Sequence, residues 1–133
     1  MFLNQIDHIA IATNNSSKCI DFFINYLNFK QIHEEKMNDM EIFITVLKNK
    51  FIHLEIITPI NENSFLNKFI KKHNTAIHHI AFKTDDIFAN VNYLKNKGIK
   101  FTKNIIEKGI FNKNIIFIHP KSTGGILIEL CQK

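Results

Sequence analysis

Residues 77–86 read Ile-His-His-Ile-Ala-Phe-Lys-Thr-Asp-Asp, and residues 6–15 read Ile-Asp-His-Ile-Ala-Ile-Ala-Thr-Asn-Asn, which is nearly the same series. Aligning His8 with His79 gives an offset of 79 − 8 = 71 residues, at which the neighbouring isoleucine, alanine and threonine positions also coincide. Self-similarity of this kind indicates a duplicated structural unit. The sequence therefore predicts two related modules in one chain.

Each module also carries an acid in its last strand-like run. Glu55 follows His8 by 55 − 8 = 47 residues, and Glu129 follows His79 by 129 − 79 = 50 residues. Taken singly, a strand histidine is more often structural and a strand glutamate more often faces solvent. Both acids, however, lie inside apolar runs, where an unpaired carboxylate is costly to bury. The repetition favours a site built from two histidines and two carboxylates.

The hydrophobic spacing predicts a strand, a helix and three further strands in each module. The expected strands cover residues 6–12, 29–37, 40–48 and 51–58 in the first module, and 77–84, 101–106, 114–119 and 125–131 in the second. An amphipathic helix over 61–74 is expected to connect them. This order predicts an α+β fold with two tandem βαβββ modules, paired into a curved mixed sheet around a metal-containing cavity.

Helix-end residues recur at matching places in the two modules. Asn14, Asn15 and Ser16 in the first module, and Asp85 or Asp86 in the second, offer side-chain oxygens that can accept hydrogen bonds from the first turn of a helix. Asn28 and Gly98 tolerate the left-handed conformation that commonly ends a helix.

A chain of 133 residues suits one domain over 1–133, with modules at about 1–60 and 75–133 joined by the 61–74 helix.

The bulk composition excludes several classes of protein. Hydrophobic residues make up 45% of the chain without any long apolar run, so we expect no membrane span, no signal peptide and a cytoplasmic location. Cys19 and Cys131 stand alone, which argues against a disulfide framework or a thiolate zinc site. The 17 basic residues are all lysines and are scattered, so the formal charge of +5 does not indicate nucleic-acid binding.

Four nitrogen and oxygen donors without thiolate suit a borderline to hard divalent ion such as cobalt, manganese, nickel or zinc. With His8, Glu55, His79 and Glu129 at equivalent places in two βαβββ modules, the chain resembles the vicinal oxygen chelate superfamily, which includes glyoxalases, bleomycin-binding proteins and dioxygenases. Within it the chain is most similar to the methylmalonyl-CoA epimerase family, through residues 6–10, 54–59, 77–82 and 117–130. The resemblance covers nearly the whole chain.

The resemblance implies that His8, Glu55, His79 and Glu129 hold one divalent metal ion, with cobalt favoured. It also implies an acid/base pair, Glu41 and Glu129, that moves the C2 proton of methylmalonyl-CoA between the two faces of an enolate. Acyl-CoA is then the substrate, and a homodimer is the expected assembly. Relatives usually carry glycine near Phe111 or Asn112, so the loop after Gly109 departs from the family pattern.

Other candidates are less specific. His119 and Lys121 are expected to contact the CoA thioester or phosphates, although a plain turn explains them equally well. His53 shares the strand face of Glu55 and is a candidate for lining the cavity. A role in supporting the ligands or in the core is the alternative. His78 lies on the strand face opposite to His79, and we interpret it as structural. Cys131 is interpreted as a small apolar side chain that fills space in the core.

Two other functions remain open on the same fold. A glyoxalase I-type lyase or isomerase would use the same metal ligands, and a turn at 119–125 unlike the glyoxalase pattern weighs against it. A non-catalytic drug-binding protein is the second alternative, and the complete set of four ligands weighs against that.

Overall fold

The computed structural model describes residues 3–133, which divide into two compact units. One unit is His8–His78, and the other joins the chain up to Asp7 with His79–Lys133. The boundaries fall inside strands β1 (Leu3–Ala12) and β5 (Ala76–Thr84), so both strands contribute residues to both units. The prediction of a single domain with a connecting segment at 61–74 stays a prediction.

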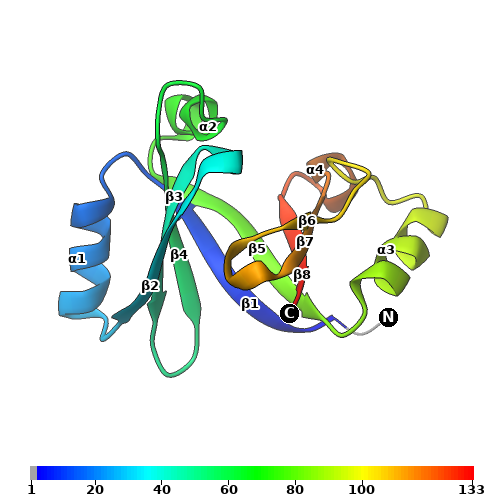
Figure 1. The fold of residues 1–133 in the computed structure, drawn as a ribbon, viewed down its shortest axis with the longest axis horizontal. Coiled ribbons are helices and arrows are strands. Elements are labelled where there is room, and N and C mark those ends of the chain that lie inside the picture. The colour runs from blue at the N-terminus through cyan, green and yellow to red at the C-terminus, as the bar shows by residue number, and fades with distance from the viewer. Residues whose placement is uncertain (1–2) are drawn as a thin grey trace. The chain divides into compact units, whose positions relative to one another are not determined.

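The His8–His78 unit holds four strands and two α-helices. After β1 come α1 (Ser16–Tyr26), β2 (Lys30–Met37), the 3-10 turn η1 (Asn38–Met40), β3 (Ile42–Lys48), β4 (His53–Pro59) and α2 (Leu66–His73). The strands are ordered β2-β3-β4-β1; β2, β3 and β4 pair antiparallel, and β1 runs parallel to β4. Figure 1 shows α1 lying along one face of these strands.

The core of this unit lies between α1 and the sheet. Leu47 on β3 and Leu54 and Ile56 on β4 are buried in a cluster against which Ile20 and Phe23 of α1 pack. Side chains alternate between the two faces of a strand. Glu55, between two core residues, therefore lies on the face opposite α1.

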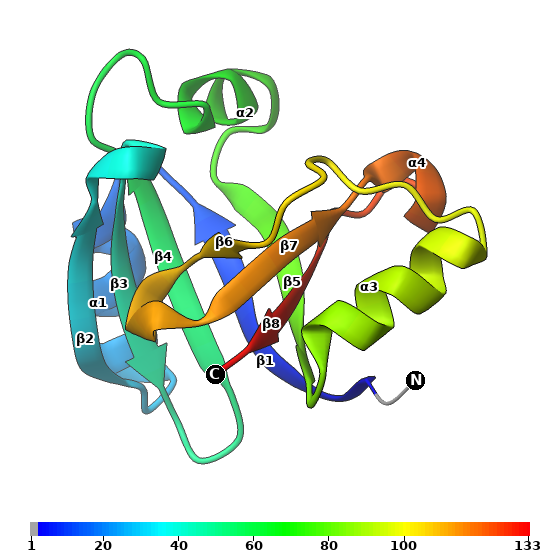
Figure 2. The same ribbon diagram turned by 45° about the vertical axis from the view of Figure 1, so that its right-hand side comes forward.

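The other unit repeats the plan with shorter strands. It contains β5, α3 (Ile87–Asn96), β6 (Glu107–Lys108), the 3-10 turn η2 (Ile110–Asn112), β7 (Asn114–Ile118), α4 (Pro120–Thr123) and β8 (Ile128–Gln132). The order is β5-β8-β7-β6, with β5 parallel to β8 (Figure 2). Ile87 and Val91 of α3 pack on Ile116 and Leu130, which leaves Glu129 on the opposite face.

The α+β class and the repeated βαβββ order are confirmed. The predicted helix ends are also confirmed: Asn15 accepts from the Lys18 backbone N–H at 3.3 Å, and Asp86 from that of Ala89 at 2.9 Å. Asn28 and Gly98 adopt positive φ values of 59° and 83° after the first and third helices. None of the helices in residues 3–133 is both long enough and apolar enough to cross a membrane.

Several predicted elements are wrong in extent: β3 begins at Ile42 and not at Met40, β8 begins at Ile128 and not at Gly125, and two other elements differ more. The helix expected over 61–74 begins only at Leu66, because the Asn61 and Ser64 side chains accept from the backbone of Asn63 and Leu66 and hold a turn. The strand expected over 101–106 is reduced to an isolated bridge between Phe101 and Ile118, followed by β6. Residues 102–105 are exposed and Ile106 is partly buried against the core, so this segment has little apolar surface to bury.

Candidate functional site

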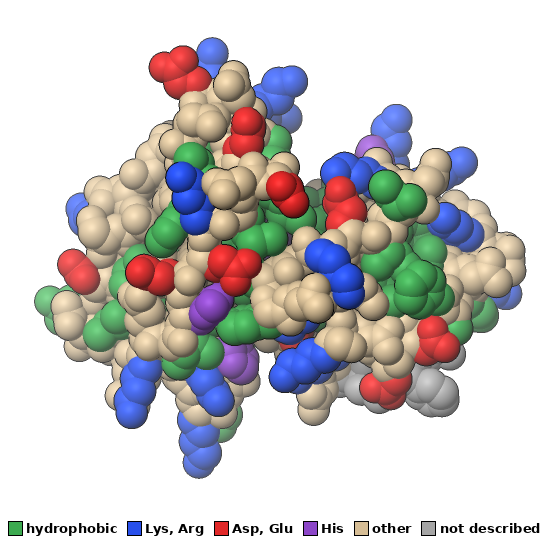
Figure 3. All heavy atoms as spheres, in the orientation of Figure 1, with side chains coloured by type: hydrophobic (Ala, Val, Ile, Leu, Met, Phe, Trp, Pro, Cys, Tyr) green, Lys and Arg blue, Asp and Glu red, His purple; other side chains and the backbone are tan. Residues whose placement is uncertain are grey.

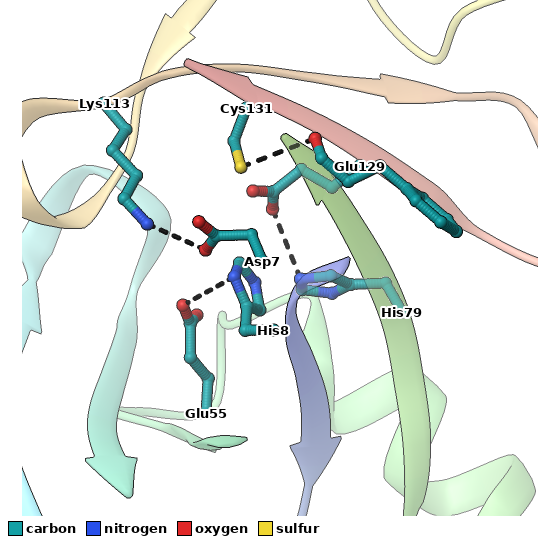
Figure 4. Close-up of polar contacts among 8 residues, drawn as sticks. Asp7, His8, Glu55, His79, Lys113, Glu129 and Cys131 are labelled. Carbon is teal, nitrogen blue, oxygen red and sulfur yellow. Dashed lines mark hydrogen bonds and ion pairs between the residues drawn. The ribbon is translucent and has the colours of Figure 1, made fainter. Parts of the chain in front are cut away.

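His8 and Glu55 form a buried pair on neighbouring parallel strands of the His8–His78 unit. The register pairs Ala10 of β1 with Glu55 of β4, and His8 Nδ1 lies 3.2 Å from Glu55 Oε2 (Figure 4). Their side chains are 4% and 7% exposed. Ala10 and Ala12 follow His8 on the same face, and such small side chains leave room beside the imidazole.

The second unit contains a matching pair. Ala81 of β5 pairs with Glu129 of β8, and His79 Nε2 lies 3.2 Å from Glu129 Oε2. Both side chains are 6% exposed. The ring of Phe117, from β7, packs edge-on against His79 with centroids 5.1 Å apart. The sequence repeat is thus a repeat of geometry, because in each unit the histidine stands two residues before the alanine that pairs with the glutamate.

Burial makes these pairs chemically significant. An ionised carboxylate is stable away from water only when it is paired, hydrogen-bonded or bound to a metal. Imidazole nitrogen and carboxylate oxygen are also the donors that borderline divalent ions accept in proteins. The donor set of each pair therefore fits metal ligation.

A buried ion pair that the sequence did not predict lies in the second unit. Lys113 Nζ donates to Asp7 Oδ1 at 2.8 Å, and the two side chains are 10% and 8% exposed (Figure 4). The partners are 106 residues apart, so no local pattern signals the contact. The pair fixes the end of the η2 turn, in which Phe111 and Asn112 both have φ of 56°.

Glu41 lies at a turn rather than in a strand. It follows η1 with φ 54° and ψ 37°, and its carbonyl accepts from Ile60 N–H at 3.0 Å. Val46 is the residue of β3 that pairs with Glu55. β3 begins at Ile42, four positions before Val46, so at about 3.3 Å per residue its start lies about 13 Å along the sheet, and Glu41 lies in the turn before that start. The structure does not bring Glu41 next to Glu55.

The remaining candidates lie in local contacts. His119 caps α4, its Nδ1 accepting from Lys121 N–H at 3.1 Å, while Lys121 itself is exposed. His53 pairs with Lys48 at the start of β4 and shares the face of Glu55. The His78 ring packs on Phe69 of α2 with centroids 4.8 Å apart, which agrees with a structural role.

Neither cysteine forms a disulfide. Cys131 is buried and its thiol donates to the Phe82 carbonyl at 3.6 Å, as expected of a small core side chain. Burial raises the pKa of the Cys19 thiol above its ordinary value. On the face shown in Figure 3 the lysines are spread out.

Residues 7–117 match the sequence profile of the family described as the Glyoxalase/Bleomycin resistance protein/Dioxygenase superfamily. The mitochondrial methylmalonyl-CoA epimerase of Dictyostelium discoideum is 32% identical, over 98% of this chain and 80% of that protein. The ethylmalonyl-CoA/methylmalonyl-CoA epimerase of Cereibacter sphaeroides is 30% identical, over 98% of both chains. A methylmalonyl-CoA epimerase solved in complex with methylmalonyl-CoA and NH4+ superimposes with a TM-score of 0.91 at 29% identity, covering 98% of this chain and 94% of that one.

Proposed function

This chain belongs to the glyoxalase/bleomycin resistance protein/dioxygenase superfamily, and we propose that it interconverts (2R)- and (2S)-methylmalonyl-CoA. The observation that carries the proposal is the buried His–Glu pair that occurs in the same strand register in both units. Relatives named as epimerases that align with almost the whole chain support the choice of reaction. The complex with methylmalonyl-CoA supports an acyl-CoA substrate.

In this proposal His8, Glu55, His79 and Glu129 together hold one divalent ion. Two nitrogens and two carboxylate oxygens suit cobalt, manganese, nickel or zinc, and cobalt is the expectation from the family resemblance. The bound ion would supply a Lewis acid that stabilises negative charge on the thioester oxygen while C2 is deprotonated.

Epimerisation needs a proton removed from one face of C2 and another delivered to the opposite face. Glu129 is proposed as one proton carrier, taking the C2 proton on a carboxylate oxygen and returning it in the reverse direction. The sequence-based candidate for the other carrier is Glu41, which remains a prediction. His119 and Lys121 are proposed to contact the CoA portion, and the homodimer and cytoplasmic location also remain predictions.

The test is deuterium incorporation at C2 of each epimer in heavy water. Metal-free protein should exchange slowly, and addition of cobalt, manganese or zinc should accelerate exchange and epimerisation together. Ethylmalonyl-CoA, run in parallel, measures how strictly the acyl group is recognised. Metal binding without C2 exchange would refute the proposal, and turnover of a methylglyoxal–thiol adduct by that protein would favour the glyoxalase-type reaction.

A further inference from the structure

Two lysines lie directly opposite one another on neighbouring strands of the His8–His78 unit. Lys30 is the first residue of β2, and it pairs with Lys48, the last residue of β3. Like charges that face each other across a strand pair are destabilising. Both side chains are exposed, and within residues 3–133 neither ammonium group forms an ion pair that offsets this repulsion. An anion bound between the two lysines would offset it.

This lysine pair, Lys30 and Lys48, lies on the same face of the sheet as Glu55. Lys48 also pairs with His53 of β4, which precedes Glu55 by two residues. Residues two apart in a strand share a face, and so do residues directly opposite each other. The row of Lys30, Lys48 and His53 therefore stands about 7 Å along the strands from the row of Glu55. Figure 2 shows β2, β3 and β4 side by side.

The two acids on this face of β2, β3 and β4 already have partners. Glu55 Oε2 lies 3.2 Å from His8 Nδ1, and Glu35 Oε1 lies 3.0 Å from His33 Nε2. No carboxylate on this face of the three strands is therefore paired with the two lysines. The lysine pair is an uncompensated positive charge that suits an anionic ligand from solution.

The two ends of this face carry opposite charge. From the row of Glu55 toward η1, the face is apolar and buried at Ile57, and the turn that follows carries Asp39 and Glu41. In the other direction the face ends in the lysine pair. In acyl-CoA a long uncharged arm separates the thioester from the phosphate groups. If the thioester lies at Glu55, electrostatics favour phosphates at the lysine end, because the acids at the other end repel them.

We propose that Lys30 and Lys48 bind the phosphate groups of the acyl-CoA substrate; the inference rests on the proposed epimerase function. A lysine ammonium is a compact point charge that suits phosphate oxygens, and strand pairing holds two of them side by side. The alternative is that Lys30 only protects an edge strand from pairing with another chain. That role does not account for Lys48, because β3 is paired on both sides.

The test compares methylmalonyl-CoA with the methylmalonyl thioester of pantetheine, which lacks the phosphate groups. Epimerisation of both is measured in metal-loaded wild type, Lys30→Gln, Lys48→Gln and the double variant. Each single substitution should raise the KM for methylmalonyl-CoA about fivefold, the effect of one exposed ion pair, without changing kcat. The KM for the pantetheine thioester should be the same in all four proteins, because it has no phosphate to bind.

Lys36→Gln is the matched control. Lys36 is exposed on the same strand and its substitution removes the same charge, but it pairs with Phe43 and lies on the opposite face. Its KM for both thioesters should equal that of the wild type. Added salt should raise the KM for methylmalonyl-CoA more in the wild type than in the double variant, because salt screens contacts between exposed charges.

Calorimetric titration with free CoA tests the lysine site without turnover. Weaker CoA binding in the two single variants, with Lys36→Gln like the wild type, supports the inference. An unchanged KM for methylmalonyl-CoA in the double variant overturns it, as does an equal rise in KM for both thioesters. Absence of C2 exchange in the wild type defeats the proposed function itself, and the calorimetric comparison then decides the lysine site: equal CoA affinity in the wild type and the double variant overturns it.

Discussion

Replacing Lys113 by methionine should destabilise the protein strongly, because it leaves the Asp7 carboxylate buried without its cation. The two side chains are about nine-tenths buried and their charged atoms are 2.8 Å apart. Removal of one partner from such a pair costs about 3–5 kcal/mol in the free energy of unfolding. Methionine retains much of the lysine side-chain volume, so the loss reports mainly on charge.

The chain contains a control with similar geometry and different burial. Lys103 Nζ lies 2.7 Å from Glu107 Oε1, but the lysine side chain is 59% exposed. Exposed pairs contribute about 0–1 kcal/mol, so Lys103→Met should change stability by no more than that. Burial, rather than distance, is what the comparison tests.

The assay is urea unfolding of the wild type, Asp7→Asn, Lys113→Met and the double variant. If the two charges are coupled, the free energy of unfolding lost in the double variant should be smaller than the sum of the losses in the two single variants, by at least about 2 kcal/mol. A loss of less than about 1 kcal/mol in Lys113→Met, equal to that of Lys103→Met, would refute the reasoning.

Three further predictions concern other sites. Glu55→Ala should weaken binding of zinc or cobalt at least tenfold by calorimetry, because even residues that only support ligands have effects of about 10–100-fold; unchanged affinity would remove Glu55 from the ligand set. Phe111→Gly should be more stable to urea than Phe111→Ala by about 1 kcal/mol, since φ is 56° and only glycine adopts it without strain; an equal stability would contradict this. The Cys19 thiol should alkylate more slowly than free cysteine at pH 8, and faster as pH rises above its ordinary pKa, because burial raises its pKa; mass spectrometry measures both.

The two His–Glu pairs were predictable because they follow from strand alternation and from the sequence repeat. Alternation along a strand fixes which residues share a face, and the repeat aligns His8 with His79 and Glu55 with Glu129. The helix starts were predictable to within a few residues because capping chemistry acts over three residues, and the structure identifies Asn15 and Asp86 as the caps.

Other features were not predictable because they depend on distant partners or on a single-residue shift. The Asp7–Lys113 pair joins segments 106 residues apart. The alternation around Glu41 suggested a strand, but the turn that begins at Asn38 continues through Glu41 before β3 begins. A bulge has no local composition signal, and the one at Ile32 changes the face of every later residue of β2.

The outer strands show that a duplicated fold need not be duplicated in every element. The two units repeat the His–Glu pairs, whose positions are fixed by the parallel pairing of β1 with β4 and of β5 with β8. The segment of the second unit that corresponds to β2 forms an isolated bridge between Phe101 and Ile118 before β6. Symmetry is retained at the two His–Glu pairs. It is lost at the outer strands, where β2 is a bulged strand of eight residues and its counterpart is reduced to an isolated bridge.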